Sequence, residues 1–207
     1  MKIKICGITN VEDAKVAWES GADALGFVLY AKSPRYVEPQ LIKSIVSTLP
    51  PFVVSVGIFV NESSKTVQNI MEKCGLTYAQ LHGDESPEYC ATLGRPILKA
   101  LRLKDRSSFL SLAEYRGRAG VKGFVVDTFS ESAYGGTGQT TDWSLAAEVA
   151  NATTILLAGG LTPDNVQEAI TQVHPYGVDV SSGVEASAGK KDHDKVRAFI
   201  HAAQLVS

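Results

Sequence analysis

Short apolar runs alternate with amphipathic stretches along the whole chain, and this alternation restricts the possible folds more than any other feature. We expect strands at residues 3–6, 24–29, 53–59, 78–81, 97–101, 123–127, 154–158 and 178–181. Several of these runs are apolar without interruption, residues 155–158 among them. Uninterrupted apolar runs are typical of strands that are covered on both faces in a parallel sheet.

A helix is expected after each strand, at residues 11–19, 39–49, 63–73, 87–93, 107–115, 142–150, 163–172 and 192–204. Asn10 is a favoured N-cap residue for the first of these helices. The sequence Thr162-Pro163-Asp164 combines a capping hydroxyl, a proline for the first helical position and an acid for the first turn. We therefore expect the seventh helix to begin at Pro163.

Eight strand–helix units predict an α/β fold, a single-domain (β/α)8 or TIM barrel over residues 1–207. The competing fold is a doubly wound open sheet, which usually has five or six strands and, when it binds a dinucleotide, a GxGxxG turn after the first strand. Here the first strand ends in Cys6-Gly7-Ile8-Thr9, which is not such a turn. No linker or low-complexity tract divides the chain, so we favour one barrel.

Composition excludes several classes of protein. The chain has 20 basic and 22 acidic residues and is 44% hydrophobic, which argues against a disordered chain and against a basic nucleic-acid binder. Its three cysteines form no CxxC pair, so we expect no zinc site and a reducing compartment. The longest apolar stretch, residues 52–60, is too short to span a membrane, and the N-terminus lacks the apolar centre of a signal peptide. We expect a cytoplasmic protein.

The active site of such a barrel lies at the carboxyl ends of its strands, and a phosphate site is commonly built after strands seven and eight. Five residues follow those two strands here: Gly159, Gly160, Ser181, Ser182 and Gly183. Glycines let the backbone approach a ligand, and helix N-termini offer free N–H groups. We favour a phosphate site over the alternative, in which these glycines only make tight turns.

Two further strand ends carry residues suited to proton transfer. Cys6 is the last residue of the first strand, and its position is explained equally well by filling the core or by acting as a base, for which its thiol pKa would have to fall below the usual value. Asp127 ends the sixth strand, where a buried carboxylate is costly unless it is paired or functional. Asp179 lies inside the last strand and is equally well explained as a structural or a functional acid. Cys74 and Cys90 are expected to fill the core.

Loop residues complete the set of candidates. The guanidinium of Arg35 suits a carboxylate or a phosphate, although a surface salt bridge is the simpler explanation. His82 follows the fourth strand and fits either a general acid or base, or an ordinary loop histidine. The long segment 128–141 contains Tyr134-Gly-Gly-Thr-Gly138 and has the length of a lid or binding loop.

Seven segments resemble the phosphoribosylanthranilate isomerase family. They are residues 4–9 (KICGIT), 21–27 (GADALGF), 33–36 (SPRY), 80–84 (QLHGD), 134–138 (YGGTG), 157–161 (LAGGL) and 177–185 (GVDVSSGVE). The resemblance runs from the first strand to the last helix. It implies a (β/α)8 barrel of tryptophan biosynthesis that performs an Amadori rearrangement of N-(5-phosphoribosyl)anthranilate without metal or cofactor.

The resemblance also implies roles for individual residues. Cys6 would be the general base and Asp127 the general acid, Arg35 would face the anthranilate part, and His82 would be a further substrate-binding residue. The two loops at Gly159-Gly160 and Ser181-Ser182-Gly183 would bind the phosphate. The expected partner is a small phosphosugar, with no nucleic acid or membrane, and the chain would act as a monomer or a homodimer.

Two alternatives remain open. Another phosphosugar barrel, such as an epimerase or an indole-glycerol-phosphate synthase type, would need metal-ligating histidines or lysines at its strand ends. Lys99 is the one candidate lysine and His82 the one histidine at a strand end. A non-catalytic barrel that binds phosphate ligands would keep the glycine loops but lose the acid and the base.

Overall fold

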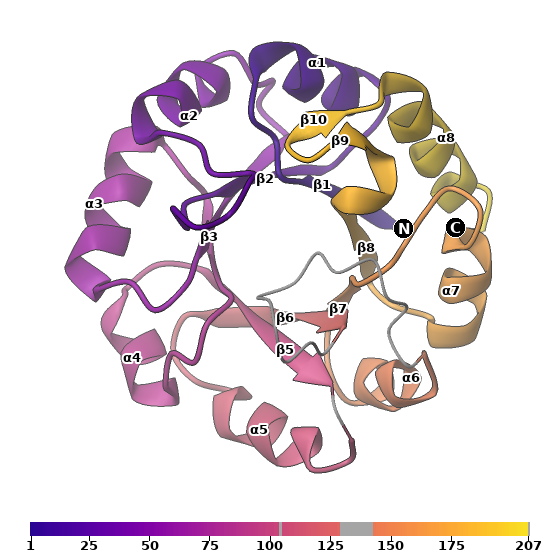
Figure 1. Cartoon of the computed structure of the whole chain (residues 1–207). Coiled ribbons are helices and arrows are strands. Elements are labelled where there is room, and N and C mark those ends of the chain that lie inside the picture. Colours follow the sequence, from indigo (N-terminus) through magenta and orange to yellow (C-terminus); the bar gives the residue numbers. More distant parts are fainter. Residues whose placement is uncertain (104, 129–142, 207) are drawn as a thin grey trace.

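The structure, a computed structural model, describes residues 1–103, 105–128 and 143–206. Eight parallel strands close into a barrel in the order β1 to β8, and the helices surround it (Figure 1). The strands are β1 (Lys2–Cys6), β2 (Ala24–Val28), β3 (Val54–Phe59), β4 (Tyr78–Leu81), β5 (Ile97–Leu103), β6 (Val121–Thr128), β7 (Ile155–Leu157) and β8 (Gly177–Val180). The helices are α1 (Val11–Glu19), α2 (Pro39–Val46), α3 (Ser64–Cys74), α4 (Pro87–Thr92), α5 (Ser108–Tyr115), α6 (Trp143–Ala152), α7 (Val166–Val173) and α8 (His193–Gln204). The predicted (β/α)8 fold is confirmed.

Strand β1 shows how the barrel separates its core from its site. Side chains alternate along a strand. Ile3 and Ile5 are buried in the main hydrophobic core, whereas Lys4 contacts Gln80 and Asp179, which lie on other strands. Pairing of β1 with β8 closes the barrel and sets Lys4 opposite Asp179 in register. The outward face of β1 therefore stabilises the fold, and its inward face holds polar groups.

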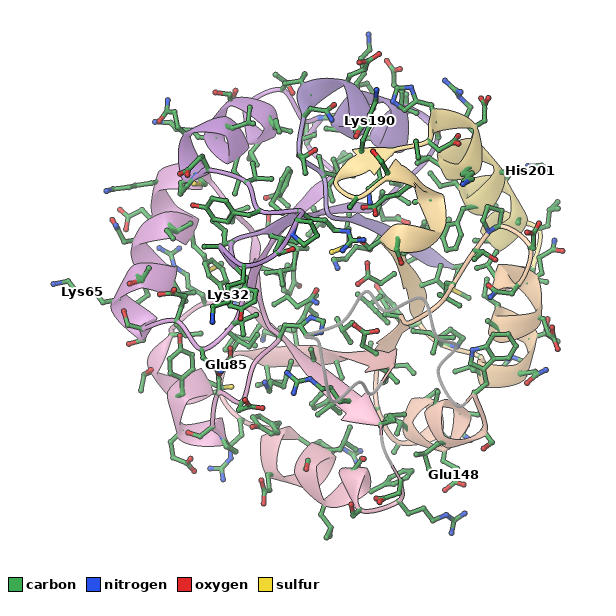
Figure 2. The ribbon with its side chains drawn as sticks, viewed as in Figure 1. Lys32, Lys65, Glu85, Glu148, Lys190 and His201 are labelled. Carbon is green, nitrogen blue, oxygen red and sulfur yellow. The ribbon has the colours of Figure 1, made fainter. Side chains whose placement is uncertain are left out.

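Polar residues on the outside of the helices face solvent. Lys65 on α3 and Glu148 on α6 project away from the barrel (Figure 2).

Cys74 and Cys90 are 3% and 0% exposed and belong to the main core, as expected. Among the described residues, no helix combines the length and the apolar character needed to cross a membrane.

The first helix begins as predicted, and the seventh does not. The side chain of Asn10 accepts a hydrogen bond from the Asp13 N–H at 2.8 Å, as an N-cap residue does. Helix α7 begins at Val166, three residues after the expected Pro163. Asn165 Oδ1 instead accepts from the Thr162 N–H at 2.8 Å, and Asn165 Nδ2 donates to the Gly160 carbonyl at 3.0 Å. These bonds hold residues 163–165 as a turn ahead of the helix.

A small hairpin after β8 was not predicted. A 3-10 turn, η1 (Ser182–Val184), leads into the antiparallel pair β9 (Glu185–Ser187) and β10 (Lys190–Lys191). Strands of three and two residues are too short to show a periodic pattern. The expected long loop with Tyr134-Gly-Gly-Thr-Gly138, and the expected helix start at residue 142, lie outside the described residues.

Candidate active site

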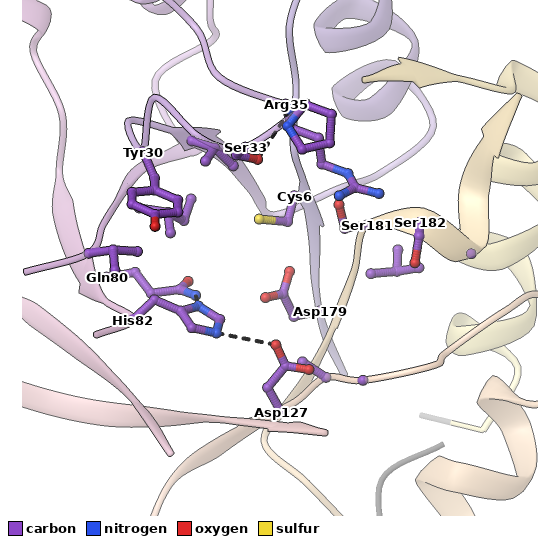
Figure 3. Close-up of a pocket in the computed structure, with 18 of the residues that line it drawn as sticks. Cys6, Tyr30, Ser33, Arg35, Gln80, His82, Asp127, Asp179, Ser181 and Ser182 are labelled. Atoms are coloured by element: carbon purple, nitrogen blue, oxygen red, sulfur yellow. Dashed lines mark hydrogen bonds and ion pairs between the residues drawn. The ribbon is translucent and has the colours of Figure 1, made fainter. Parts of the chain in front are cut away.

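A cavity of about 400 Å³ opens at the carboxyl ends of the strands. Its lining includes all nine residues that the sequence singled out as site residues: Cys6, Arg35, His82, Asp127, Gly159, Gly160, Ser181, Ser182 and Gly183. They come from segments as far apart as β1 and the loop after β8. Figure 3 shows Cys6 and Asp127 on opposite sides of the cavity, with Asp179 between them.

The thiol of Cys6 lies beside two lysines. Burial raises the pKa of the Cys6 thiol above its usual value, and the nearby Asp179 raises it further. The ammonium groups of Lys4 and Lys191 act in the opposite direction. The lowered thiol pKa that would make Cys6 a ready base is therefore not found, because burial outweighs the two lysines.

Lys4 and Asp179 form a buried ion pair inside the barrel. Lys4 Nζ lies 2.6 Å from Asp179 Oδ2, and the two side chains are 1% and 6% exposed. Burial lowers the pKa of Lys4, but the charges of Asp179 and Cys6 outweigh this effect and raise it. Burial raises the pKa of the Asp179 carboxyl, against the pull of Lys4. Asp179 is thus both a structural partner of Lys4 and a residue of the cavity lining.

Asp127 faces His82 across the cavity. Asp127 Oδ2 lies 3.3 Å from His82 Nε2, and both side chains are about nine-tenths buried. The other ring nitrogen, Nδ1, is 3.0 Å from Nε2 of Gln80 (Figure 3). The structure therefore brings the expected acid next to an imidazole whose orientation depends on a neighbouring amide.

Arg35 reaches the cavity while it is paired with a carboxylate of the protein. Its Nε and Nη2 donate to the two oxygens of Glu185 at 2.8 and 2.7 Å. Lys191 Nζ donates to Glu185 Oε1 at 3.0 Å. Burial raises the pKa of Glu185, but the hydrogen bonds and charges of Arg35 and Lys191 outweigh it, and the pKa lies below its usual value. The β9–β10 hairpin therefore fixes the position of Arg35.

The two glycine loops after β7 and β8 pack directly on each other. Gly159 and Gly160 have φ angles of 89° and 68°, which favour glycine. A Cβ on Gly183 would overlap the carbonyl oxygen of Leu161, so only glycine allows this approach. The backbone of both loops therefore lines one end of the cavity, where the sequence predicts a phosphate.

Three polar residues of the site and its surroundings were not predicted: Lys4, Glu185 and Lys191. Gln80 lies in the predicted segment at the end of the fourth strand, but the sequence assigns it no role. A signal existed for Lys4, because it precedes Cys6 by two residues and so shares its face of the strand. Glu185 and Lys191 lie on the hairpin that left no periodic pattern. Their partners are distant in sequence, which no local pattern reveals.

Lys99, the candidate lysine of a synthase-type site, has a structural partner. Its Nζ donates to Glu85 Oε2 at 2.8 Å and to the Gly83 carbonyl at 2.7 Å, and its side chain is 3% exposed. It does not line the cavity at the barrel mouth. Within the described residues, no group of three or more His, Cys, Asp or Glu side chains is arranged to hold a metal ion. Neither observation favours the alternative phosphosugar barrels.

Comparison with known proteins agrees with this geometry. The family model of N-(5′-phosphoribosyl)anthranilate isomerase matches residues 3–202. The N-(5′-phosphoribosyl)anthranilate isomerase of Pelobacter propionicus is 52% identical over 204 residues, which cover 99% of this chain and 96% of that protein.

Solved structures give the same result. Phosphoribosyl anthranilate isomerase from Thermotoga maritima matches with a TM-score of 0.91 and 42% identity over 99% of this chain and 98% of the other. A phosphoribosyl anthranilate isomerase in complex with reduced 1-(o-carboxyphenylamino)-1-deoxyribulose 5-phosphate matches with a TM-score of 0.88 and 41% identity, with the same coverage. The chain, with its acid, its thiol and its paired glycine loops at one barrel mouth, belongs to the N-(5′-phosphoribosyl)anthranilate isomerase family.

Proposed function

We propose that this chain, as one domain over residues 1–207, converts N-(5′-phosphoribosyl)anthranilate into 1-(2-carboxyphenylamino)-1-deoxyribulose 5-phosphate in tryptophan biosynthesis. The observation that carries the proposal is the presence of a carboxyl group and a thiol on opposite sides of one cavity in a member of this family. The cavity volume of about 400 Å³ suits a ligand of this size.

The reaction needs an acid first. Asp127, in its protonated form, gives its proton to the furanose ring oxygen, and the bond between that oxygen and C1 breaks. The nitrogen lone pair forms a C=N⁺ bond, which leaves an iminium ion and a free hydroxyl. A positioned acid of this kind contributes about 10²–10⁴-fold in rate.

The second step needs a base. The thiolate of Cys6 removes the proton from C2, and the C–H electrons form a C1=C2 bond while the iminium becomes a neutral amine. The resulting enolamine then tautomerises to the ketone by proton exchange at C1 and the C2 hydroxyl. The positive charge of the iminium stabilises a nearby thiolate. In the bound intermediate it therefore adds to the charges of Lys4 and Lys191, which lower the pKa of the Cys6 thiol while burial raises it.

The remaining candidates bind the two ends of the substrate. Arg35 faces the anthranilate part from the position that Glu185 sets. The loops at Gly159-Gly160 and Ser181-Ser182-Gly183 bind the phosphate through backbone N–H groups. His82 contributes a contact beside Asp127. The chemistry as proposed requires neither a metal nor a cofactor.

A turnover assay tests this function. With phosphoribosylanthranilate as substrate, we expect a loss of anthranilate-type fluorescence that depends on enzyme concentration. Tight binding of a phosphosugar without turnover would instead support the non-catalytic binding barrel. We expect a cytoplasmic monomer or homodimer without a nucleic-acid partner, and sedimentation velocity distinguishes the two assembly states.

A further inference from the structure

A row of polar contacts crosses the inside of the barrel and ends at the acid. Lys4 Nζ donates to Gln80 Oε1 at 2.9 Å. Gln80 Nε2 lies 3.0 Å from His82 Nδ1, and His82 Nε2 lies 3.3 Å from Asp127 Oδ2. The row joins β1, β4 and β6, and its first two members are each 1% exposed. At each contact, the chemistry of one partner determines which atom of the next donates the hydrogen bond.

Lys4 determines which way the Gln80 amide points. An ammonium group has three donors and no acceptor, so it must meet the oxygen of the amide and not its NH₂ group. The charge of Lys4 is secured by Asp179, whose Oδ2 lies 2.6 Å from Nζ. Turning the amide over would set two donors against each other in a dry interior, at the cost of an unmade hydrogen bond. Gln80 therefore presents its NH₂ group to His82.

The amide in turn determines which ring nitrogen of His82 carries the proton. A donor from Gln80 requires a lone pair on Nδ1. A neutral imidazole has one N–H, so that proton lies on Nε2, the nitrogen that faces Asp127. Arg102 Nη2 donates to the backbone carbonyl of His82 at 3.0 Å, while the ring itself is oriented by its contacts with Gln80 and Asp127.

We propose that Gln80, oriented by Lys4, is a positioning residue that holds His82 as its Nε2–H tautomer, with this N–H directed at Asp127. Nε2 is buried, lies 3.3 Å from Oδ2 and makes no hydrogen bond of good geometry with any described residue, and Asp127 is the acceptor that its proton faces. When Asp127 has given its proton to the ring oxygen, the Nε2–H stabilises the carboxylate that remains. Before that step it occupies Oδ2, so the acidic proton lies on Oδ1. This consequence rests on the proposed function, but the tautomer does not.

The tautomer is measured by ¹⁵N NMR of the histidine side chains in the ligand-free protein. In the wild type we expect an unprotonated Nδ1 and a protonated Nε2 for His82, whose signals are assigned by their loss in His82→Asn. In Gln80→Glu, the carboxylate offers Nδ1 only an acceptor, so we expect Nδ1 to gain a proton. The signals of His193, whose Nε2 lies 2.9 Å from Asp13 Oδ1, should not move.

Kinetics of the same variants test the positioning role. We expect Gln80→Glu to lower kcat by about 10–100-fold, the usual range for a residue that orients another, with little change in KM. Gln80→Met, which keeps the volume and loses the donor, should lower kcat and leave His82 as a mixture of tautomers. Gln68→Glu is the matched control, because Gln68 makes amide contacts to backbone carbonyls at the surface, and it should change neither readout.

A protonated Nδ1 in the wild type would overturn the proposal, and this result needs no variant to fold. A kcat within a factor of about two in Gln80→Glu, with the tautomer inverted, would also overturn it, because such a loss is far below that of a positioning contact. Absence of turnover in the wild type would refute the proposed function instead, whichever tautomer His82 adopts.

Discussion

Cys6 and Asp127 are the two residues on which the proposed proton transfers depend. Replacing either by a residue that cannot exchange a proton removes a whole step, whereas a lost phosphate contact weakens only binding. We expect Cys6→Ala and Asp127→Asn to lower kcat by at least about 10²-fold, with circular dichroism unchanged. Cys74→Ser, in the core and away from the cavity, is the control and should keep near-normal turnover. A near-normal kcat in Cys6→Ala would show that another group is the base.

The thiol of Cys6 also sets an expected pH dependence. Burial raises the pKa of this thiol, and only its deprotonated form accepts a proton from C2. Because kcat/KM also requires Asp127 to be protonated, it does not follow the thiol alone. The rate at which a small alkylating reagent modifies Cys6 follows its thiolate, and we expect this rate to keep rising with pH above neutrality, toward and beyond the ordinary thiol value of about 8.5. A plateau that is already reached below pH 7 would contradict the assignment of the free thiol as base.

The burial and the ion pair of Lys4 could not be predicted from the residues next to it in the sequence. In the segment MKIKIC, a lysine between two isoleucines looks like a solvent-facing residue of an edge strand. In the barrel it is 1% exposed and its charge is paired with Asp179. Alternation places Lys4 on the same face as Cys6, but only closure of the barrel brings Asp179 to that face.

Among the elements, the β9–β10 hairpin has the clearest separate role, since its Glu185 pairs with Arg35 and its Lys191 pairs with Glu185. Removing one partner of a buried ion pair costs about 3–5 kcal/mol, because a charge stays buried without compensation. We expect Glu185→Gln to destabilise the protein by roughly this amount and to raise KM more than it lowers kcat. Urea unfolding and steady-state kinetics measure the two effects.

The same residue adds a pH dependence to stability. The folded-state pKa of Glu185 lies below its unfolded value, so its contribution is present above about pH 4.5 and is lost as pH falls through the folded-state value. Glu185→Gln should therefore lose less stability than the wild type between pH 6 and pH 3. Equal losses would mean that Glu185 is not held as a carboxylate.

The elements themselves were predicted unevenly, and for physical reasons. Helix α1 (Val11–Glu19) and strand β4 (Tyr78–Leu81) have the expected bounds. Helix α7 begins later than its local signals indicate, because Asn165 bonds back to Thr162 and Gly160. Local propensity favours a start at Pro163, and the contact with the loop after β7 outweighs it.

The whole molecule should respond when its cavity is filled, because residues from β1 to the loop after β8 line it. A ligand present at 100 times its Kd stabilises the folded state by about 2.7 kcal/mol. For a chain of this size, that shifts Tm by about 5–10 °C. We expect this rise with reduced 1-(o-carboxyphenylamino)-1-deoxyribulose 5-phosphate, measured by thermal unfolding.

Two controls locate that effect. Ser182→Ala should need a higher ligand concentration for the same rise, because it removes a side-chain hydroxyl from the proposed phosphate site and leaves the backbone N–H groups in place. Anthranilate without the phosphosugar should give a smaller rise at equal concentration. If the reduced compound left Tm unchanged at high concentration, the cavity would not be its binding site.

The sequence by itself determined the alternation of eight strands with helices, and hence the barrel and the edge at which its polar residues gather. Periodicity, glycines and strand ends are local properties, and each can be read within a few residues. The tertiary structure alone decided which polar groups meet. Lys4 and Asp179 are 175 residues apart, and Arg35 and Glu185 are 150 apart. These pairs follow from the register between β1 and β8 and from the fold of the hairpin over the barrel mouth, which no local pattern encodes.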